Sequence, residues 1–239
     1  MGKFGKWIGG GLGWVFGGPL GALLGFAVGS MFDEDEFEGI PKNRGNTTRG
    51  DFILSLLVLV GAVMKADGKV LRSELQHVNQ FFIVNFGKDE AREAMLMLRD
   101  ILKQNLNIAE IGNQIKNNLD YSSRIQLLHF LFGISKADGK VDPNEVIIIE
   151  KISYYLGITG KDYHSIKSMF IDDTDAAYRI LEISSDASNE EVKKAYHKMA
   201  AKHHPDKVSY LGPEVQENAK KKFQKILDAY TKIKNERGM

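Results

Sequence analysis

Three histidines and an aspartate lie within a short stretch of the chain: His197, then His203 and His204, then Asp206 after Pro205. A histidine beside a carboxylate is typical of general acid–base catalysis, and clustered histidines are typical of zinc sites. Neither chemistry is favoured here, because Pro205 works against a relay geometry and no nucleophile accompanies the pair. The chain has no cysteine, and no acidic zinc ligand accompanies the three histidines. We therefore expect a protein that is not an enzyme and that needs no cofactor at this loop.

A second candidate for chemistry is a repeat, because the hexapeptide Lys-Ala-Asp-Gly-Lys-Val occurs at 65–70 and again at 136–141. In each copy a glutamate follows the aspartate by seven residues, which matches the second half of an EF-hand calcium loop. The acidic residues concerned are Asp67, Glu74, Asp138 and Glu145. The first half of each loop lacks oxygen ligands and carries Lys65 or Lys136 instead, so we expect neither loop alone to bind calcium tightly. A divalent cation shared by the two loops stays open as an alternative.

The elements around this repeat have a helical pattern from 51 to 172, with apolar residues at three- and four-residue spacing. The expected helices cover 52–65, 74–86, 90–102, 108–119, 121–135, 145–156 and 162–170. No segment alternates as a strand does, so the expected fold class is all-α. Asp142, Pro143 and Glu145 fit a helix start with a capping box, which explains Glu145 without a metal. This organisation resembles the TerB-like domain, and the resemblance implies an all-helical bundle.

Two further helices are expected on either side of the His-Pro-Asp tripeptide, at Asn189–His203 and Lys220–Lys234. Ser188 and Glu191 fit a capping box at the start of the first helix. Pro205 fixes its own φ and keeps His204 out of the helical region, so the first helix should end there. Apolar stripes should join the two helices into a hairpin; they consist of Val192, Tyr196, Met199 and Ala200 in the first helix and Phe223, Ile226, Leu227, Tyr230 and Ile233 in the second.

A helical hairpin closed by His-Pro-Asp resembles a J domain, and the resemblance covers residues 174–239. It implies a partner rather than a substrate, namely a DnaK-type chaperone whose ATP hydrolysis the tripeptide stimulates. The residues that the resemblance assigns to partner binding are His204, Pro205, Asp206, Lys193, Lys194, Lys198, Lys202 and Tyr196. Two positions depart from the family pattern: His197 stands where a lysine is common, and the stretch from Val208 to Ala219 is longer than usual.

The N-terminal segment from Trp7 to Phe32 is an uncharged run of 26 residues. At ~1.5 Å per residue it is long enough to cross a bilayer core of ~30 Å. Every fourth residue is a small one, which favours close pairing of membrane helices; these residues are Gly9, Gly13, Gly17, Gly21, Gly25 and Gly29. We expect a transmembrane helix within 1–32 that forms a homodimer, followed by a linker at 33–50. A secretory signal peptide and a soluble glycine-rich hairpin are the alternatives.

The net charge of +1 does not favour nucleic acid as a partner. A membrane helix, a TerB-like domain at 51–172 and a J domain, in that order, resemble the membrane-anchored DnaJ-like co-chaperones of the DjlA type. The resemblance implies a single-pass protein of the bacterial inner membrane whose C-terminal domains face the cytoplasm and recruit a DnaK-type chaperone. The alternative function is a metal- or stress-responsive membrane adaptor that acts through the TerB-like domain.

Overall fold

The structure is a computed structural model that describes residues 20, 49–65, 70, 72–136, 141–171 and 175–239. Within these residues the regular elements are all helices, which confirms the expected all-α class. The predicted membrane segment at 1–32, apart from Leu20, and most of the linker lie outside the described residues. None of the helices in the described part is both long and apolar enough to span a bilayer.

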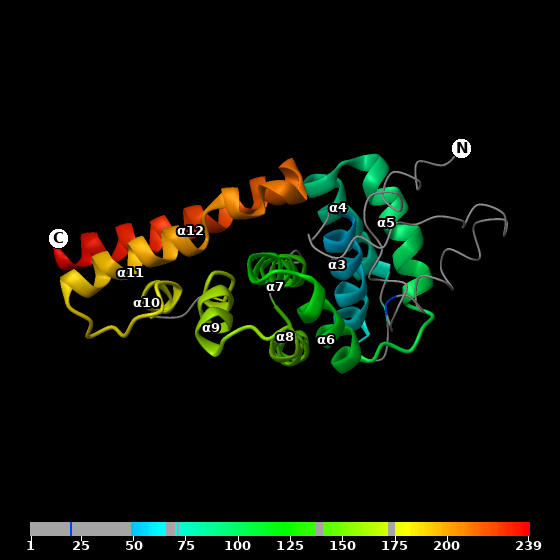
Figure 1. The fold of residues 1–239 in the computed structure, drawn as a ribbon, viewed down its shortest axis with the longest axis horizontal. Coiled ribbons are helices and arrows are strands. Elements are labelled where there is room, and N and C mark those ends of the chain that lie inside the picture. The colour runs from blue at the N-terminus through cyan, green and yellow to red at the C-terminus, as the bar shows by residue number, and fades with distance from the viewer. Residues whose placement is uncertain (1–19, 21–48, 66–69, 71, 137–140, 172–174) are drawn as a thin grey trace.

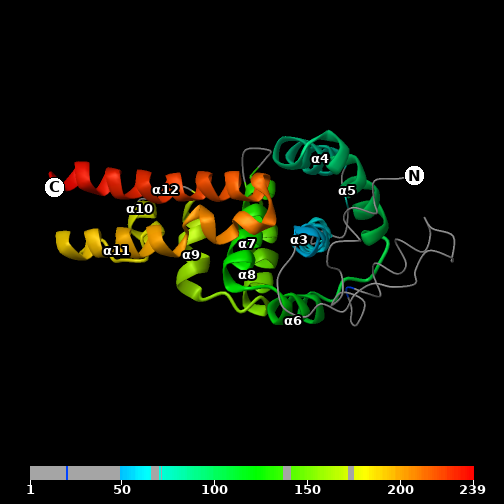
Figure 2. The same cartoon turned by 45° about the horizontal axis from the view of Figure 1, so that its top comes forward.

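The centre of the molecule is α3 (Arg49–Met64), which is buried from Asp51 to Met64. A helix that is apolar on all sides is stable only inside a protein, and α3 is contacted by α5, α6, α7 and α8. Figure 2 shows it almost end-on with other helices around it. The other helices of the bundle are α4 (Arg72–Phe86), α5 (Lys88–Ile101), α6 (Ile108–Asn118), α7 (Tyr121–Ser135), α8 (Pro143–Tyr155) and α9 (Gly160–Ser168). The bounds of α3 and of these six helices agree with the expected bounds to within three residues.

Local signals in the sequence fix where several of these helices begin. The side chain of Asp142 accepts a hydrogen bond from the backbone N–H of Asn144 at 2.7 Å, and Glu145 reaches back to the N–H of Asp142 at 3.4 Å. The capping box expected at the start of α8 is therefore confirmed. Between α6 and α8 the packing depends on Gly112, because a Cβ atom there would lie 2.5 Å from the Cβ of Tyr155.

The C-terminal part is a helical hairpin that consists of α10 (Ala176–Ile180), α11 (Asn189–Lys202), the 3-10 helix η3 (Pro205–Leu211) and α12 (Pro213–Arg237). The prediction that α12 begins at Lys220 is wrong, since the helix begins at Pro213. Gly212, with φ of 107°, makes the turn, and proline is well suited to the first position of a helix. The stretch from Val208 to Ala219, between the two expected helices, buries four apolar side chains, which are Val208, Leu211, Val215 and Ala219.

The hairpin packs against the bundle rather than standing free of it. The N-terminal part of α12 contacts α4 and α7, η3 contacts α3 and α7, and α10 contacts α9. Figure 1 shows α12 running from the end of α4 along α7 and α9 to the C-terminus, with α11 beside its outer half. The His-Pro-Asp tripeptide therefore lies where the hairpin meets the bundle.

Candidate functional site

The tripeptide begins immediately after α11. His204 has φ of −61° and ψ of 133°, which is extended backbone, and Pro205 starts η3. This is the conformation that the ring of a following proline imposes, so the predicted end of the helix is confirmed. At the other end of α11, the side chain of Ser188 accepts the N–H of Glu191, and Glu191 accepts the N–H of Ser188 at 2.7 Å. The predicted capping box is also present.

The two polar side chains of the tripeptide are exposed and lie beside each other. Relative exposures are 52% for the side chain of His204 and 75% for that of Asp206. The Nδ1 atom of His204 accepts the backbone N–H of Asp206 at 3.3 Å and lies 3.5 Å from its Oδ2. The Nε2 group of Gln216 donates to Oδ1 of Asp206 at 3.4 Å. The carboxylate is thus oriented by α12 and still open to a partner.

The hairpin is joined along the apolar stripes that the sequence predicts. Tyr196 stacks on Tyr230 with ring centroids 4.5 Å apart. Val192, Met199 and Ile226 are fully buried between the helices. The ring of His204 also meets the edge of an aromatic residue of α12, Phe223, at a centroid distance of 6.0 Å. Packing of both helices therefore supports the position of the tripeptide.

The four lysines assigned to partner binding do not share one environment. Lys193, Lys194 and Lys198 are exposed on α11. Lys202 is instead directed at the bundle, where its ammonium group forms ion pairs with Asp162 of α9 and, at 3.0 Å, with Glu182. The first three lysines therefore form an exposed basic face, whereas Lys202 is engaged in ion pairs within the protein.

Asp162 is the centre of this contact between the hairpin and the bundle. Burial raises the pKa of Asp162, but hydrogen bonds from Lys202, Tyr121 and Thr159 outweigh burial and hold the pKa below its ordinary value. Tyr121 donates to Oδ2 of Asp162 at 2.6 Å, and Thr159 donates to the same atom at 2.7 Å. The carboxylate is therefore ionised, and it anchors the end of α11.

A buried polar cluster forms a second contact, between α12 and α7. The ammonium of Lys222 donates to Oε1 of Gln126 at 2.9 Å, and Nε2 of Gln126 donates to Oδ1 of Asn218 at 2.8 Å. His129 shares Oδ1 of Asn218 at 3.0 Å. Burial, reinforced by the cations of Lys222 and Lys225, holds the pKa of His129 well below its ordinary value, so its imidazole is neutral. The sequence analysis did not find this cluster.

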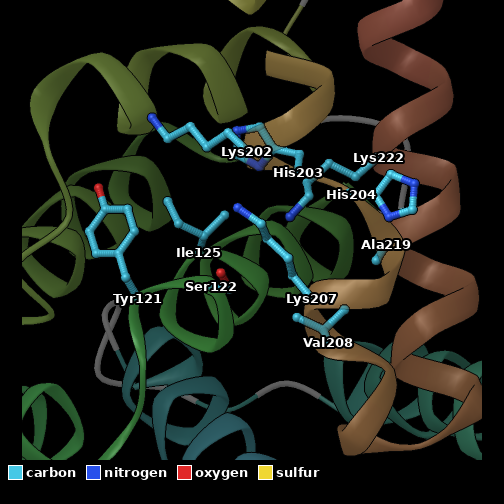
Figure 3. Close-up of a pocket in the computed structure, with 10 residues that line it drawn as sticks. All are labelled: Tyr121, Ser122, Ile125, Lys202, His203, His204, Lys207, Val208, Ala219 and Lys222. Atoms are coloured by element: carbon cyan, nitrogen blue, oxygen red, sulfur yellow. The ribbon is translucent and has the colours of Figure 1, made fainter. Parts of the chain in front are cut away.

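A cavity of about 270 Å³ separates the tripeptide from α7. Figure 3 shows the ten residues that line it: Tyr121, Ser122, Ile125, Lys202, His203, His204, Lys207, Val208, Ala219 and Lys222. Among these residues Ile125 belongs to α7, Val208 to η3 and Lys222 to α12. The bundle and the hairpin both contribute to this cavity, so it exists only because they are packed together.

The candidate metal ligands of the repeat are only partly within the described residues. Asp67 and Asp138 lie outside them. Glu74 and Glu145 line one small cavity of about 40 Å³ together with His77, so the two copies of the repeat do approach each other. In the described part of the chain, however, these three residues do not converge to metal-binding distance. The idea of a shared cation therefore stays a prediction.

One group of possible ligands in the described residues does converge, and it consists of Asp162, Glu182 and His203. The ammonium of Lys202 already pairs with both carboxylates, which makes the group unsuited to a cation. A zinc site at His197, His203 and His204 was not expected from the sequence. His203 does lie near an acidic residue, since its Nε2 is 4.0 Å from Oδ1 of Asp162, but that residue comes from a distant helix.

Three family models match the chain. They are the Co-chaperone DjlA transmembrane domain at residues 1–49, the Tellurite resistance protein TerB at 54–168 and the DnaJ domain at 176–238. No solved structure matches it.

Curated relatives named Co-chaperone protein DjlA align along most or all of the chain. The relative from Coxiella burnetii is 26% identical over 269 residues, which covers the whole of both chains. The relative from Photobacterium profundum is 27% identical and aligns with 98% of this chain and 99% of its own. One from Vibrio vulnificus is 28% identical over 79% of each chain. The chain therefore belongs to the DjlA-like J-domain co-chaperones, which combine a DjlA-type transmembrane domain, a TerB-like domain and a C-terminal J domain.

Proposed function

We propose that this chain recruits a DnaK-type chaperone to a membrane and stimulates its ATP hydrolysis through His204, Pro205 and Asp206. The observation that carries the proposal is the exposure of His204 and Asp206 on a loop whose backbone is fixed by Pro205 and by η3. A loop held in one conformation loses little entropy when a partner binds it. The protein itself then acts as a regulator and performs no bond chemistry.

The exposed basic face of α11 supports the same partner interaction. Lys193, Lys194 and Lys198 present three cations roughly two to three helical turns before the tripeptide. Such a patch accelerates association with an acidic surface and makes the association rate depend on ionic strength. We therefore assign these lysines to docking and the tripeptide to stimulation.

The test is the steady-state ATP turnover of DnaK with the full-length chain in neutral-detergent micelles. The wild type should stimulate turnover several-fold, and His204→Gln should abolish the stimulation. His164→Gln is the matched control, because His164 is exposed on α9, outside the hairpin that carries the loop. Absence of stimulation by the wild type, or equal stimulation by His204→Gln, would show that the proposal is wrong.

The location of the protein belongs to the same proposal. We place a single membrane span within residues 1–32 of the chain, in the bacterial inner membrane, with the C-terminal domains in the cytoplasm and the glycine series as a dimer contact. The DjlA transmembrane match at 1–49 supports a membrane location. Protease treatment of intact spheroplasts tests the orientation, since cytoplasmic domains should stay intact until the membrane is opened. Cross-linking of Gly17→Cys chains tests the dimer.

The adaptor function remains a second candidate because Glu74 and Glu145 line one cavity. A divalent cation held there would be detected by calorimetric titration of the full chain with calcium. The double variant Glu74→Gln, Glu145→Gln should then lose the binding heat. An unchanged titration in this variant would remove the cavity from consideration.

A further inference from the structure

The cavity between the tripeptide and α7 has a lining of unusual charge. Five of its ten lining residues are lysines or histidines, and none is Asp or Glu. The basic residues are Lys202, His203, His204, Lys207 and Lys222. Ser122 adds a hydroxyl group, which can donate a hydrogen bond, whereas the hydroxyl of Tyr121 already donates to Asp162. A hollow with many donors and no carboxylate in its wall favours an anion.

Lys222 gives this cavity a buried amino group, which is a cation when protonated. Its side chain is only about 3% exposed, and the hydrogen bond to Gln126 uses one of the three N–H groups of an ammonium ion. Burial lowers the pKa of Lys222 to about 7, and the carboxylate of Asp162 on α9 opposes that effect. Asp162 is itself ion-paired with Lys202, so it cannot serve as the dedicated partner of Lys222. Burying a charge is costly unless another charge and hydrogen bonds compensate for it.

His203 and Lys207 add two further groups to the same space. The Nε2 atom of His203 is buried and has no hydrogen-bond partner among the described residues; it lies 4.0 Å from Oδ1 of Asp162, whose charge is paired with Lys202. Lys207 is exposed, and its side chain and that of Lys222 extend towards the middle of the cavity, while the ammonium of Lys202 points away (Figure 3). The cavity thus has a buried floor at Lys222 and His203, and it opens to solvent beside His204 and Lys207.

We propose that this cavity binds the phosphate group of a small anion, between Lys222 and His203 on the floor and Lys207 at the entrance. A phosphate carries up to two negative charges and several acceptor oxygens, which match the two ammonium groups and the hydroxyl of Ser122. At about 270 Å³, the cavity is several times the ~30 Å³ that one water molecule occupies in the liquid. It therefore has room for a phosphate with a small organic substituent.

The position of the site gives the ligand a structural consequence. Lys207 belongs to η3, Lys222 to α12 and Ser122 to α7, so a phosphate bound among them bridges the hairpin and the bundle. A ligand that binds only the packed arrangement stabilises that arrangement by mass action. This proposal goes beyond the stimulation of a chaperone, because the ligand is a small molecule and it binds between the loop and α7.

The test is calorimetric titration of the full-length chain in neutral-detergent micelles with inorganic phosphate, against sodium chloride of equal ionic strength. Phosphate should bind the wild type, and Lys222→Met should weaken binding at least about tenfold, as expected for loss of one charge-assisted hydrogen bond. Lys207→Met should weaken binding as well, and since Lys207 is exposed this variant tests the site without disturbing the core. Lys221→Met is the matched control, because Lys221 is the exposed neighbour of Lys222.

A second arm identifies the source of the phosphate. Micelles doped with phosphatidic acid should compete with inorganic phosphate if the group belongs to a lipid headgroup, and should leave the titration unchanged if the ligand is free in solution. Either result keeps the proposal. The proposal would be overturned if the wild type gave no binding heat, or if Lys222→Met and Lys207→Met bound phosphate as tightly as the wild type. It would also be overturned if Lys221→Met lost as much affinity as these two variants.

Discussion

Replacing the buried ammonium of Lys222 by the similarly shaped side chain of methionine should make the protein more stable at pH 7. Lys222 lies in the contact between α12 and α7, where burial lowers its pKa from the ordinary lysine value of 10.5 to about 7. Between these two values the unfolded chain holds a proton on Lys222 that the folded chain does not. Unfolding therefore takes up a proton, and the stability of the wild type rises with pH across this window.

The expected magnitude follows from the same pKa values. Each pKa unit corresponds to ~1.36 kcal/mol, so Lys222 costs the folded state about 4 to 5 kcal/mol at pH 7. Methionine removes this cost but leaves Oε1 of Gln126 without the ammonium donor. This loss destabilises the folded state by roughly 2 kcal/mol. Lys222→Met should thus be about 2 kcal/mol more stable than the wild type at pH 7. The advantage should vanish at about pH 9, because the free-energy cost of removing the proton from Lys222 falls by ~1.36 kcal/mol for each pH unit above 7.

The assay is urea unfolding of the full-length chain in detergent, followed by far-ultraviolet circular dichroism at pH 7 and pH 9. It measures the stability difference between Lys222→Met and the wild type at each pH. Phosphate must be absent from the buffer, since an anion bound beside Lys222 would offset the cost. Lys221→Met controls for the loss of a surface charge and should show no such dependence on pH. A Lys222→Met chain that is less stable than the wild type at pH 7, or a difference that is the same at both pH values, would refute the reasoning.

Three further predictions follow from single contacts. Lys202→Met should destabilise the protein by about 2 kcal/mol in urea unfolding, because Asp162 loses its cation while keeping two neutral donors. Gly112→Ala should cost about 1–3 kcal/mol in the same assay, since the new Cβ would meet the Cβ of Tyr155 at 2.5 Å and one helix must shift. Lys194→Glu should slow association with DnaK, and the effect should fade as salt rises; stopped-flow fluorescence measures the rate, and a rate that does not change would exclude Lys194 from docking.

Features of the fold that depend on neighbouring residues were predictable from the sequence. The periodicity of apolar residues placed the helices of the bundle, and the capping boxes at Asp142 and Ser188 are formed as expected. Pro205 ends α11 through a steric effect on His204 that operates in any context. Each of these signals acts within a few residues, which is why the chain alone reveals them.

The extent of α12 shows where the sequence misled the prediction. Residues 208–219 contain many polar and charged side chains, and Gly212 and Pro213 within them are typical of a loop. In the structure the same two residues form the start of a helix. The apolar residues Val215 and Ala219 were a signal for it, since they are four residues apart and both are buried.

The environment of individual lysines could not be predicted in the same way. Lys198 and Lys202 are four residues apart on α11, and a helical projection places them on the same side. Only one of them meets α9, because Asp162 lies beside the last turn of α11. Lys222 likewise follows two other lysines, and its burial results from the position of Gln126 on α7, nearly a hundred residues earlier in the chain.

The contact between bundle and hairpin is rich in buried polar groups, and this decides what the contact contributes. Lys222, Gln126, Asn218 and His129 are all buried there, and Asp162 with Lys202 adds an ion pair. Such groups contribute little net stability, since each must be desolvated before it can form its bonds. Misplaced by one turn of α12, however, they would be left buried without partners, at a cost of about 1–3 kcal/mol each. The contact therefore selects one orientation of the His-Pro-Asp loop relative to the bundle more than it strengthens the fold, and an anion beside Lys222 would make that orientation more stable.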